Sequence, residues 1–399
     1  MIRRRIAAVL TWQAKRYVRA SGAKVIVVTG SVGKTSTTQA IATVLSQELI
    51  VRRTLKNYNS DVGVPCSIFQ QELPVSLKNP LSWIWLMAKN EAIILRRPKV
   101  DAFVLELGTD TPGEIAEFAW LQPDMAVVTA IAPEHMENFK TIDAVAKEEL
   151  NVAAYSDVLL INKRMVDSQY LSHADNDEVF GYSRDNMDHF SLQPSDLQVV
   201  GEHSIDAAIA ALKCAELLEI SSDGMHRGAR AIVSQPGRMR AFDGIQQTRL
   251  IDDTYNSSPE AVTAALDYVY NTKAPQRIVL LGNMNELGDT SMDEHKTIGR
   301  YCDPKKLDLV VTLGPDANKH TAPEAKAAGC NVATATSAKH AADIIQGQLK
   351  SGALILLKGS QNGVFAEETV KLLLANPEDA QYLVRQSAFW MKKKTVQTQ

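Results

Sequence analysis

The chain has 399 residues, of which 45% are hydrophobic and 22% are charged. This composition is typical of a folded protein of two or three domains, and it excludes a collagenous, disordered or disulfide-rich chain. The 43 lysines and arginines are balanced by 46 aspartates and glutamates, which gives a formal net charge of −3. Because a dedicated nucleic-acid binder carries a large basic excess, we do not expect nucleic acid to be a partner.

The spacing of the four cysteines indicates whether the protein works in an oxidising or a reducing compartment. Cys66, Cys214, Cys302 and Cys330 are scattered and include no C-x-x-C pair. This spacing argues against a zinc ribbon or a redox motif and is typical of a protein in a reducing compartment, so we interpret the cysteines as buried or incidental thiols. The first apolar run, residues 6–10, is shorter than a signal-peptide core or a membrane span. We therefore expect a cytoplasmic protein.

Residues 1–22 form a basic arm that carries six cationic side chains and no acid. Its apolar side chains, among them Ile6, Val9 and Tyr17, fall near one stripe of a helix with arginines beside it. Two interpretations are open. The helix packs on the domain that follows, as such stripes usually do, or it is a basic amphipathic helix that contacts a membrane surface through residues 1–19.

Beyond the arm, short apolar runs rich in β-branched residues alternate with helical stretches. The runs lie at 25–28, 102–105, 125–128 and 158–161 and, after Pro236-Gly237, at 277–281, 309–312 and 354–357. Near-continuous apolar strands separated by helices indicate parallel sheets that are covered on both faces.

We therefore expect an α/β fold. It comprises the arm of residues 1–22, an ATP-binding domain with a central P-loop-type parallel sheet over residues 23–235, and a smaller Rossmann-like α/β domain over residues 236–399. Residues 70–97 contain no clear strand and predict a helical excursion from the first domain. The three lysines at 392–394 predict a frayed, solvated end.

The most specific motif follows the first strand, where Thr29-Gly30-Ser31-Val32-Gly33-Lys34-Thr35-Ser36 leads into a helix-forming stretch. Glycines let backbone amides curl around phosphates, and a helix N-terminus adds partial positive charge. The lysine is expected to reach the β- and γ-phosphates, and the threonine to offer its hydroxyl to Mg²⁺. The loop is shortened, because Val28 stands at the position of the first glycine in the full pattern. We predict an ATP or GTP site formed by Gly30, Ser31, Gly33, Lys34, Thr35 and Ser36.

Further segments occur in the order of one enzyme family. They are Asn57 to Pro65, Leu105 to Gly108, Pro112 to Ile115, Glu134 to Glu137, Gly201 to His203, Pro236 to Met239, Asp252 to Pro259, Leu281 to Gly288 and Lys358 to Ser360. Together with the loop they resemble the Mur ligase family, the ATP-dependent amide ligases that extend the peptidoglycan stem peptide. The last four segments are most similar to the members that add D-alanyl-D-alanine to a UDP-muramyl tripeptide.

The resemblance implies a reaction. ATP with Mg²⁺ activates a carboxylate as an acyl phosphate, an amine attacks it, and ADP and phosphate are released. The resemblance also implies that Glu106 holds magnesium and that His135 holds a second magnesium. Both follow apolar strands, where α/β sheets collect ligands, which favours these roles over a solvated glutamate or a structural histidine.

Other roles are carried over from the family by position. The nucleotide is expected to contact Arg238 near its phosphates and Asp252, Asp253, Tyr255 and Asn256 at its ribose. The two substrates are expected to contact Asn57, Asn59, Ser60, Lys358 and Ser360. Since these residues belong to both domains, domain closure would complete the site and exclude water.

The sequence departs from the family at the second metal. A lysine that carries a carbamate commonly lies fourteen residues after the histidine, and here that position is Glu149. Lys147 lies two residues earlier, which turns it by about 200° on a helix of ~3.6 residues per turn. Two hypotheses follow: Glu149 supplies the negative charge directly, as a catalytic residue and metal ligand, or the register is shifted and Lys147 is carbamoylated.

Two more departures concern the substrates. Ser204 and Ala207 stand where the family has asparagines near adenine, and Asn283 replaces an aspartate, so we expect rearranged nucleotide contacts. Family members place a UDP-recognising domain before the ATP-binding domain, where this sequence has the arm. Four functions stay open. They are the D-alanyl-D-alanine ligase, the same chemistry on a folyl, polyglutamyl or other peptide-like acceptor, a partner-dependent noncatalytic subunit, and a plain P-loop phosphotransferase, which would leave the segments at 252–259 and 358–360 unexplained.

Overall fold

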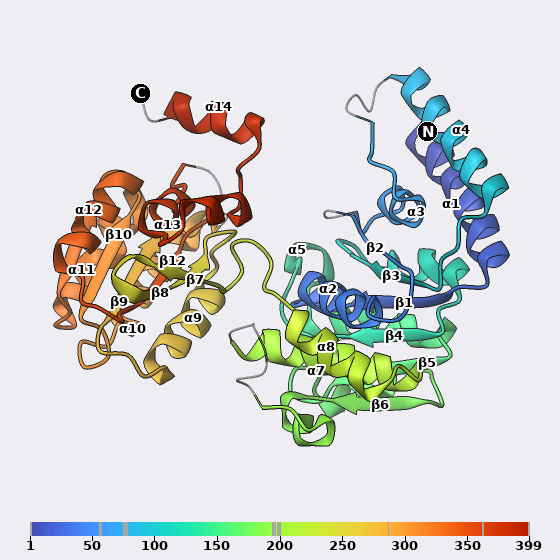
Figure 1. Cartoon of the computed structure of the whole chain (residues 1–399), viewed down its shortest axis with the longest axis horizontal. Coiled ribbons are helices and arrows are strands. Elements are labelled where there is room, and N and C mark those ends of the chain that lie inside the picture. Colours follow the sequence, from blue (N-terminus) through green and yellow to red (C-terminus); the bar gives the residue numbers. More distant parts are fainter. Residues whose placement is uncertain are drawn as a thin grey trace. The chain divides into compact units, whose positions relative to one another are not determined.

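The computed structural model describes residues 2–55, 58–74, 79–193, 197, 201–285, 287–360 and 363–397. The contacts within the chain divide it into two compact units. The first unit comprises residues 1–198 and 202–232, and the second comprises residues 199–201 and 233–399. Each unit is built on its own six-stranded sheet (Figure 1).

The sheet of the first unit is entirely parallel, with the strand order β2-β3-β1-β4-β5-β6. Its strands are β1 (Lys24–Thr29), β2 (Val51–Arg53), β3 (Ala102–Glu106), β4 (Met125–Val128), β5 (Val158–Asn162) and β6 (Val179–Tyr182). The four central strands are buried along nearly their whole length, which explains their continuous apolar sequences. The four strands predicted in this unit are confirmed. The edge strands β2 and β6 are short and partly exposed, so they carry no such signal.

Helices cover both faces of this sheet (Figure 1). The α-helices described in this unit are α1 (Ile2–Ser21), α2 (Lys34–Leu45), α3 (Gly63–Phe69), α4 (Pro80–Arg96), α5 (Met136–Phe139), α6 (Ile142–Leu150), α7 (Glu202–Leu217) and α8 (Ser222–Ala231). Helix α4 confirms the helical excursion predicted for residues 70–97. It begins where the Asn79 side chain accepts a hydrogen bond from the Leu81 amide, and it ends at Arg97 in a left-handed conformation.

Helix α1 packs on the first unit through contacts with α3 and α4. Leu10, Ala14 and Tyr17 are buried. The Tyr17 ring stacks on Phe69 with a centroid distance of 5.4 Å, and its hydroxyl donates to the Pro98 carbonyl at 3.1 Å. The interpretation of the arm as a packed helix is thus confirmed, and its contact with a membrane surface stays a prediction. Within the described part of the chain, no helix has the length and apolar character needed to cross a bilayer.

The sheet of the second unit has the order β11-β10-β9-β12-β8-β7. Its strands are β7 (Arg240–Gly244), β8 (Thr248–Asp253), β9 (Arg277–Gly282), β10 (Leu309–Leu313), β11 (Val332–Ala335) and β12 (Leu354–Lys358). Only β7 runs antiparallel, as a hairpin partner of β8. The three strands predicted in this unit are confirmed, and so is the α/β fold with a Rossmann-like second sheet.

Six α-helices are described in the second unit. They are α9 (Pro259–Asn271), α10 (Ser291–Tyr301), α11 (Ala322–Ala327), α12 (Ala338–Gln348), α13 (Glu367–Leu373) and α14 (Ala388–Gln397). The prediction of a frayed end at 392–394 is wrong, because α14 places Lys394 beside Glu367 and Glu368 at 2.9 and 2.6 Å. Two acids at the start of α13 offer partners that hold this lysine in a buried position. All four cysteines are buried, as predicted.

Candidate functional site

The phosphate loop joins the carboxyl end of β1 to α2. Strand β1 lies between β3 and β4 in the middle of the sheet, the kind of position at which parallel sheets bind ligands. Gly30 has a φ of 120°, and a Cβ there would lie 2.8 Å from the Ala130 amide nitrogen. Gly33 precedes α2 with a φ of 90°. Both positions therefore favour glycine, as expected for a loop that wraps phosphates.

The cation of the loop faces an acid. The Lys34 ammonium donates to the Gly30 carbonyl and lies 3.6 Å from Oε2 of Glu134. Lys34, Thr35 and Ser36 form the first turn of α2, and their side chains are partly exposed. The Ser31 hydroxyl donates to the Ala132 carbonyl at 3.0 Å, which ties the loop to the segment after β4.

Glu149 lies at the end of α6 and points into the loop. Its Oε2 accepts hydrogen bonds from the Gly30 amide at 2.8 Å and from the Thr29 hydroxyl, and the residue is fully buried. Burial raises the pKa of this carboxyl well above its usual range, Lys34 opposes the rise and Glu134 adds to it. Lys147, on the same helix, is exposed. The structure thus places Glu149 against the loop and Lys147 on the surface.

Three buried carboxylate oxygens near the carboxyl edge of the sheet have no hydrogen-bond partner among the described residues. They belong to Glu106 at the end of β3, to Glu134 after β4, and to Glu149. Burying such oxygens without a donor costs free energy unless a cation compensates them. Carboxylate oxygens are also the ligands that Mg²⁺ prefers, so the donor chemistry fits this ion.

The predicted metal ligands do not form one cluster. Among the residues that the structure describes, no three His, Cys, Asp or Glu side chains lie close enough together to hold an ion. Oε1 of Glu106 accepts from the Asn59 amide at 3.2 Å. His135 lies 3.3 Å from Asp110 instead, and its side chain is 45% exposed. Glu106 and His135 are therefore held by different partners.

The segment after β2 is tied to the end of β3. The Gly108 amide donates to the Asn59 carbonyl at 3.0 Å, and a Cβ on Gly108 would lie 2.6 Å from the Asn59 side-chain amide. The Ser60 hydroxyl accepts from the Gly63 amide at 3.4 Å, at the start of α3. Asn59 thus lies beside Glu106, Ser60 is bonded to the start of α3, and Asn57 lies outside the described residues.

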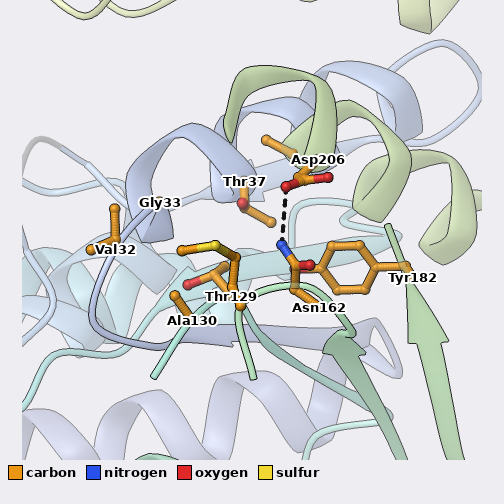
Figure 2. Close-up of a pocket in the computed structure, with 10 residues that line it drawn as sticks. Val32, Gly33, Thr37, Thr129, Ala130, Asn162, Tyr182 and Asp206 are labelled. Atoms are coloured by element: carbon orange, nitrogen blue, oxygen red, sulfur yellow. Dashed lines mark hydrogen bonds between the residues drawn. The ribbon is translucent and has the colours of Figure 1, made fainter. Parts of the chain in front are cut away.

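A pocket opens beside the loop at the carboxyl ends of β4, β5 and β6 (Figure 2). It is lined by Val32, Gly33, Thr37, Thr129, Ala130, Asn162, Met165, Tyr182, Asp206 and Ala207. The Asn162 amide donates to Oδ2 of Asp206 at 3.3 Å, and the Arg184 backbone amide donates to Oδ1 at 2.8 Å. Ala207, one of the departures from the family pattern, forms part of the wall.

Sequence reasoning missed three of the polar residues in this region. Glu134 belongs to the Glu134-to-Glu137 segment, in which only His135 was expected to act. Asn162 directly follows the strand predicted over residues 158–161, and Asp206 follows Gly201-Glu202-His203 by three residues. A polar residue directly after a buried strand was the signal available for Asn162, since such residues reach the ligand edge of a parallel sheet.

In the second unit, four predicted residues come together at the ends of β8 and β12. Lys358 is only 2% exposed, and its ammonium donates to Oδ2 of Asp253 at 2.6 Å and to the Asn256 carbonyl at 3.0 Å. The Ser360 hydroxyl donates to the Asn256 side chain at 2.9 Å. The parallel register of β8 and β12, which pairs Asp253 with Lys358, brings these distant segments side by side.

Two further predicted residues contact each other beside that cluster. The Arg238 guanidinium lies 4.5 Å from the centre of the Tyr255 ring, a cation–π contact. Asp252 is fully buried, and its carboxylate accepts from the Gly237 amide at 3.1 Å and from the Thr254 hydroxyl at 2.6 Å. In this arrangement Asp252 holds two turns together, whereas Asp253 and Arg238 lie nearer the surface.

Asp252→Asn is expected to remove a pH dependence of stability. Burial raises the pKa of Asp252 to about 6 from an ordinary 3.8. Between these values the folded state keeps a proton that the unfolded chain has lost, so the free energy of unfolding falls as the pH rises. At ~1.4 kcal/mol for each pKa unit, the free energy of unfolding of the wild type should fall by about 3 kcal/mol more than that of the variant between pH 4 and pH 7. Urea unfolding at each pH measures this, and equal losses in both proteins would contradict it.

Two family models match the chain in consecutive order. The Mur ligase middle domain matches residues 28–206, and the Mur ligase, glutamate ligase domain matches residues 237–361. The UDP-N-acetylmuramoyl-tripeptide–D-alanyl-D-alanine ligase of Bacillus subtilis is 26% identical over 393 residues, which cover 91% of this chain and 79% of the relative.

Solved structures show the same fold. MurF from Acinetobacter baumannii matches with a TM-score of 0.70 at 22% identity and covers 89% of this chain and 78% of its own. The MurF ligase of Thermotoga maritima in complex with ADP matches with a TM-score of 0.67 at 18% identity, with coverage of 94% and 84%. The phosphate loop and every strand of the two sheets except the first four residues of β1 lie inside the two matched family domains, which together span about three quarters of the residues. The chain therefore belongs to the Mur ligase family.

Proposed function

We propose that the chain is an ATP-dependent amide ligase that joins D-alanyl-D-alanine to a UDP-N-acetylmuramoyl tripeptide, a step of peptidoglycan precursor synthesis. The observation that carries this proposal is the phosphate loop with Lys34, against which the buried carboxylates of Glu134 and Glu149 converge. The B. subtilis relative is named for this activity and aligns with this chain over 79% of its own length. The same chemistry on another acceptor is the second candidate.

ATP would bind through the phosphate loop. The backbone amides at the start of α2 point toward the phosphates, and Lys34 neutralises the charge that develops when the γ-phosphoryl group moves. The substrate carboxylate attacks the γ-phosphorus, the bond to the β–γ bridging oxygen breaks, and an acyl phosphate and ADP result. The amine then attacks the acyl carbon, loses a proton, and displaces phosphate.

One Mg²⁺ would be held by Thr35 and Glu106, and a second by His135 and Glu149, beside which Glu134 offers a further buried oxygen. The ions would supply charge neutralisation at the transferred phosphoryl group. In this proposal a bound cation would offset the burial that raises the pKa of Glu149, and the ionised carboxylate would then provide the anionic oxygen that the carbamate provides elsewhere in the family. Its Oε2 also fixes the Gly30 amide, so one side chain both shapes the loop and carries the charge.

Residues of the second unit would hold the other substrate groups. Arg238 would approach the nucleotide phosphates, and Asp253, Tyr255 and Asn256 would contact the ribose. Arg238 and Asn256 are exposed and can reach a ligand. The buried Lys358 donates to Asp253 and to the Asn256 carbonyl and so fixes the orientation of both residues. Lys358 and Ser360 would position the incoming amine substrate.

Asp206→Asn is expected to weaken nucleotide binding. The pocket of Figure 2 adjoins the loop at Gly33, so we assign it to the nucleotide base. There the Asp206 carboxylate orients the Asn162 amide through a charge-assisted hydrogen bond. Weakening this bond by about 1 kcal/mol raises the KM for ATP about fivefold while kcat changes little. Initial-rate kinetics over a range of ATP concentrations measure both constants.

The matched control is Asp185→Asn, which changes an exposed aspartate of the same unit that pairs with Arg164. It should leave the KM for ATP at the wild-type value. A variant Asp206→Asn with unchanged KM, or with a KM raised equally by both substitutions, would contradict the assignment of the base pocket.

The function is tested by phosphate release over a panel of substrates. Purified protein receives ATP with a UDP-muramyl tripeptide, a folate or a short peptide as acceptor, and with D-alanyl-D-alanine, glutamate or another amine. We expect release only with the tripeptide and D-alanyl-D-alanine together. Dependence on another pair would identify the second candidate, release without either substrate would exclude a ligase, and no release with any pair would favour a partner-dependent noncatalytic subunit.

A further inference from the structure

Helices α1 and α4 lie side by side and run in the same direction at one edge of the first unit (Figure 1). The Gln13 amide donates to the Met87 carbonyl and to Glu91, both at 2.9 Å. Arg16 pairs with Glu91 at 2.9 Å. The inner faces of the two helices are thus fixed by specific contacts, and their outer faces have one defined orientation.

The outer faces carry large apolar side chains that are exposed. They are Val9 and Trp12 on α1, and Leu81, Ile84, Trp85 and Leu95 on α4, with exposed fractions of 40, 56, 71, 61, 64 and 79%. We name these six residues the helix-pair surface. On α4 the spacing of 81, 84, 85 and 95 follows one helical stripe, and Glu91, one turn before Leu95, is bonded to Arg16. The two stripes therefore lie on neighbouring helices that the Arg16–Glu91 pair joins.

This surface differs from the scattered apolar residues of an ordinary protein exterior. Six of the 18 large apolar side chains that are exposed in the described part of the chain lie on these two helices. Single exposed apolar residues are normal, but a continuous group of them marks an interaction site. The six side chains stay exposed although α1 and α4 pack against each other, so no other described part of the first unit covers the helix-pair surface.

Positive charge surrounds the helix-pair surface. Helix α1 carries six cations and no acid, while α4 carries two cations and a single acid, Glu91, which is already paired with Arg16. Arg16 lies 4.3 Å from the Trp12 ring centre, and Lys89 lies 5.4 Å from that of Trp85. Tryptophans with cations beside them are typical of side chains at a membrane interface, where the ring lies among the headgroups.

We propose that the helix-pair surface docks on an anionic lipid bilayer, with α1 and α4 lying in the plane of the interface. Such helices combine an apolar face with lysines and arginines, and anionic lipids attract the basic groups. A second copy of this chain would present the same positive charge and be repelled. The proposal is independent of the ligase activity, since it concerns none of the residues assigned to catalysis or to substrate binding.

The test is sedimentation of the full-length protein with vesicles. Wild type should bind vesicles of phosphatidylcholine with phosphatidylglycerol, bind those of phosphatidylcholine alone far more weakly, and dissociate in high salt because salt screens the attraction. The variant Arg4→Gln/Arg5→Gln/Arg19→Gln should lower the partition coefficient about 100-fold, at about fivefold for each charge removed. The matched control, Lys305→Gln/Lys306→Gln/Lys339→Gln, removes three exposed cations of the second unit and should bind like wild type.

The apolar contribution is tested separately. Ile84→Gln/Leu95→Gln should lower vesicle binding at least tenfold, whereas Met292→Gln/Leu372→Gln, at exposed sites of the second unit, should leave it unchanged. Circular dichroism checks that each variant is folded, and phosphate release with soluble substrates should stay at the wild-type rate. A failed ligase assay with intact vesicle binding would therefore contradict only the proposed function.

Two results would overturn the docking proposal. One is equal binding to neutral and anionic vesicles that does not respond to the arginine substitutions. The other is a wild-type dimer that Ile84→Gln/Leu95→Gln dissociates, because the helix-pair surface would then be covered by a second copy of the chain.

Discussion

Lys34→Ala should abolish turnover while leaving the protein folded. Lys34 is the cation in the first turn of α2, and its ammonium lies between the Gly30 carbonyl and Glu134. Phosphoryl transfer depends on positioning and on neutralising charge, and no other lysine lies in this loop. Removing a preorganised donor of this kind lowers kcat about 1000-fold. Phosphate release under saturating substrates measures the loss.

A control variant separates the loss of the Lys34 ammonium from the general effect of removing any lysine of this unit. Lys99→Ala removes a lysine of the same unit whose side chain is 75% exposed and paired only with Asp101 among the described residues, so turnover should be unchanged. Thermal unfolding of both variants shows whether the fold is retained. If Lys34→Ala keeps more than a tenth of the wild-type rate, the phosphate-loop interpretation is wrong.

Glu149→Gln should lower kcat about 100-fold with little change in stability, a loss of the size seen for one preorganised electrostatic group. The amide oxygen can still accept from the Gly30 amide, but the second carboxyl oxygen, a ligand for a cation, is replaced by an NH₂ group that cannot bind one. Glu149→Ala should lower kcat at least as much and also destabilise the fold, because the buried Gly30 amide loses its acceptor at a cost of about 1–3 kcal/mol. Kinetics and urea unfolding of both variants separate charge from positioning.

Lys147 provides the matched test of the other hypothesis. Since its side chain is exposed on α6, Lys147→Ala should keep the wild-type rate, and mass spectrometry of the intact protein should show no carbamate. A loss of activity in Lys147→Ala together with full activity in Glu149→Gln would reverse the assignment and favour the carbamoylated lysine.

Seven of the inner strands could be predicted from the sequence because strands buried on both faces are apolar along their whole length. The inner strand β8 was missed because four of its six residues are polar. The edge strands β2 and β6 lack this pattern, since solvent permits polar residues there. The lysines near the end of the chain show a second reason why a prediction from sequence fails. Three consecutive lysines look solvated by themselves, yet Lys394 is buried because α13 brings Glu367 and Glu368 to it.

Some residues of the candidate site could also be predicted from the sequence, and others could not. The phosphate loop was predictable because its function depends on consecutive residues: glycines with positive φ, then a lysine in the first helical turn. The roles of Glu134, Asn162 and Asp206 depend on contacts between segments far apart in the chain, for which single-sequence patterns carry little signal. His135 was singled out by its motif, but its neighbour in space is Asp110.

The sequence by itself determined the α/β class, the phosphate loop, the order of the family segments and the substitution at Glu149. Each of these features depends on which residue types occur at fixed spacings along a short stretch of the chain, and such spacings can be read without the tertiary structure. The tertiary structure decided which acids face Lys34, which residues line the pocket beside the loop, and that α1 and α4 share one exposed apolar surface. These depend on parallel strand register and helix packing, which join residues that lie 100 to 119 positions apart in the sequence.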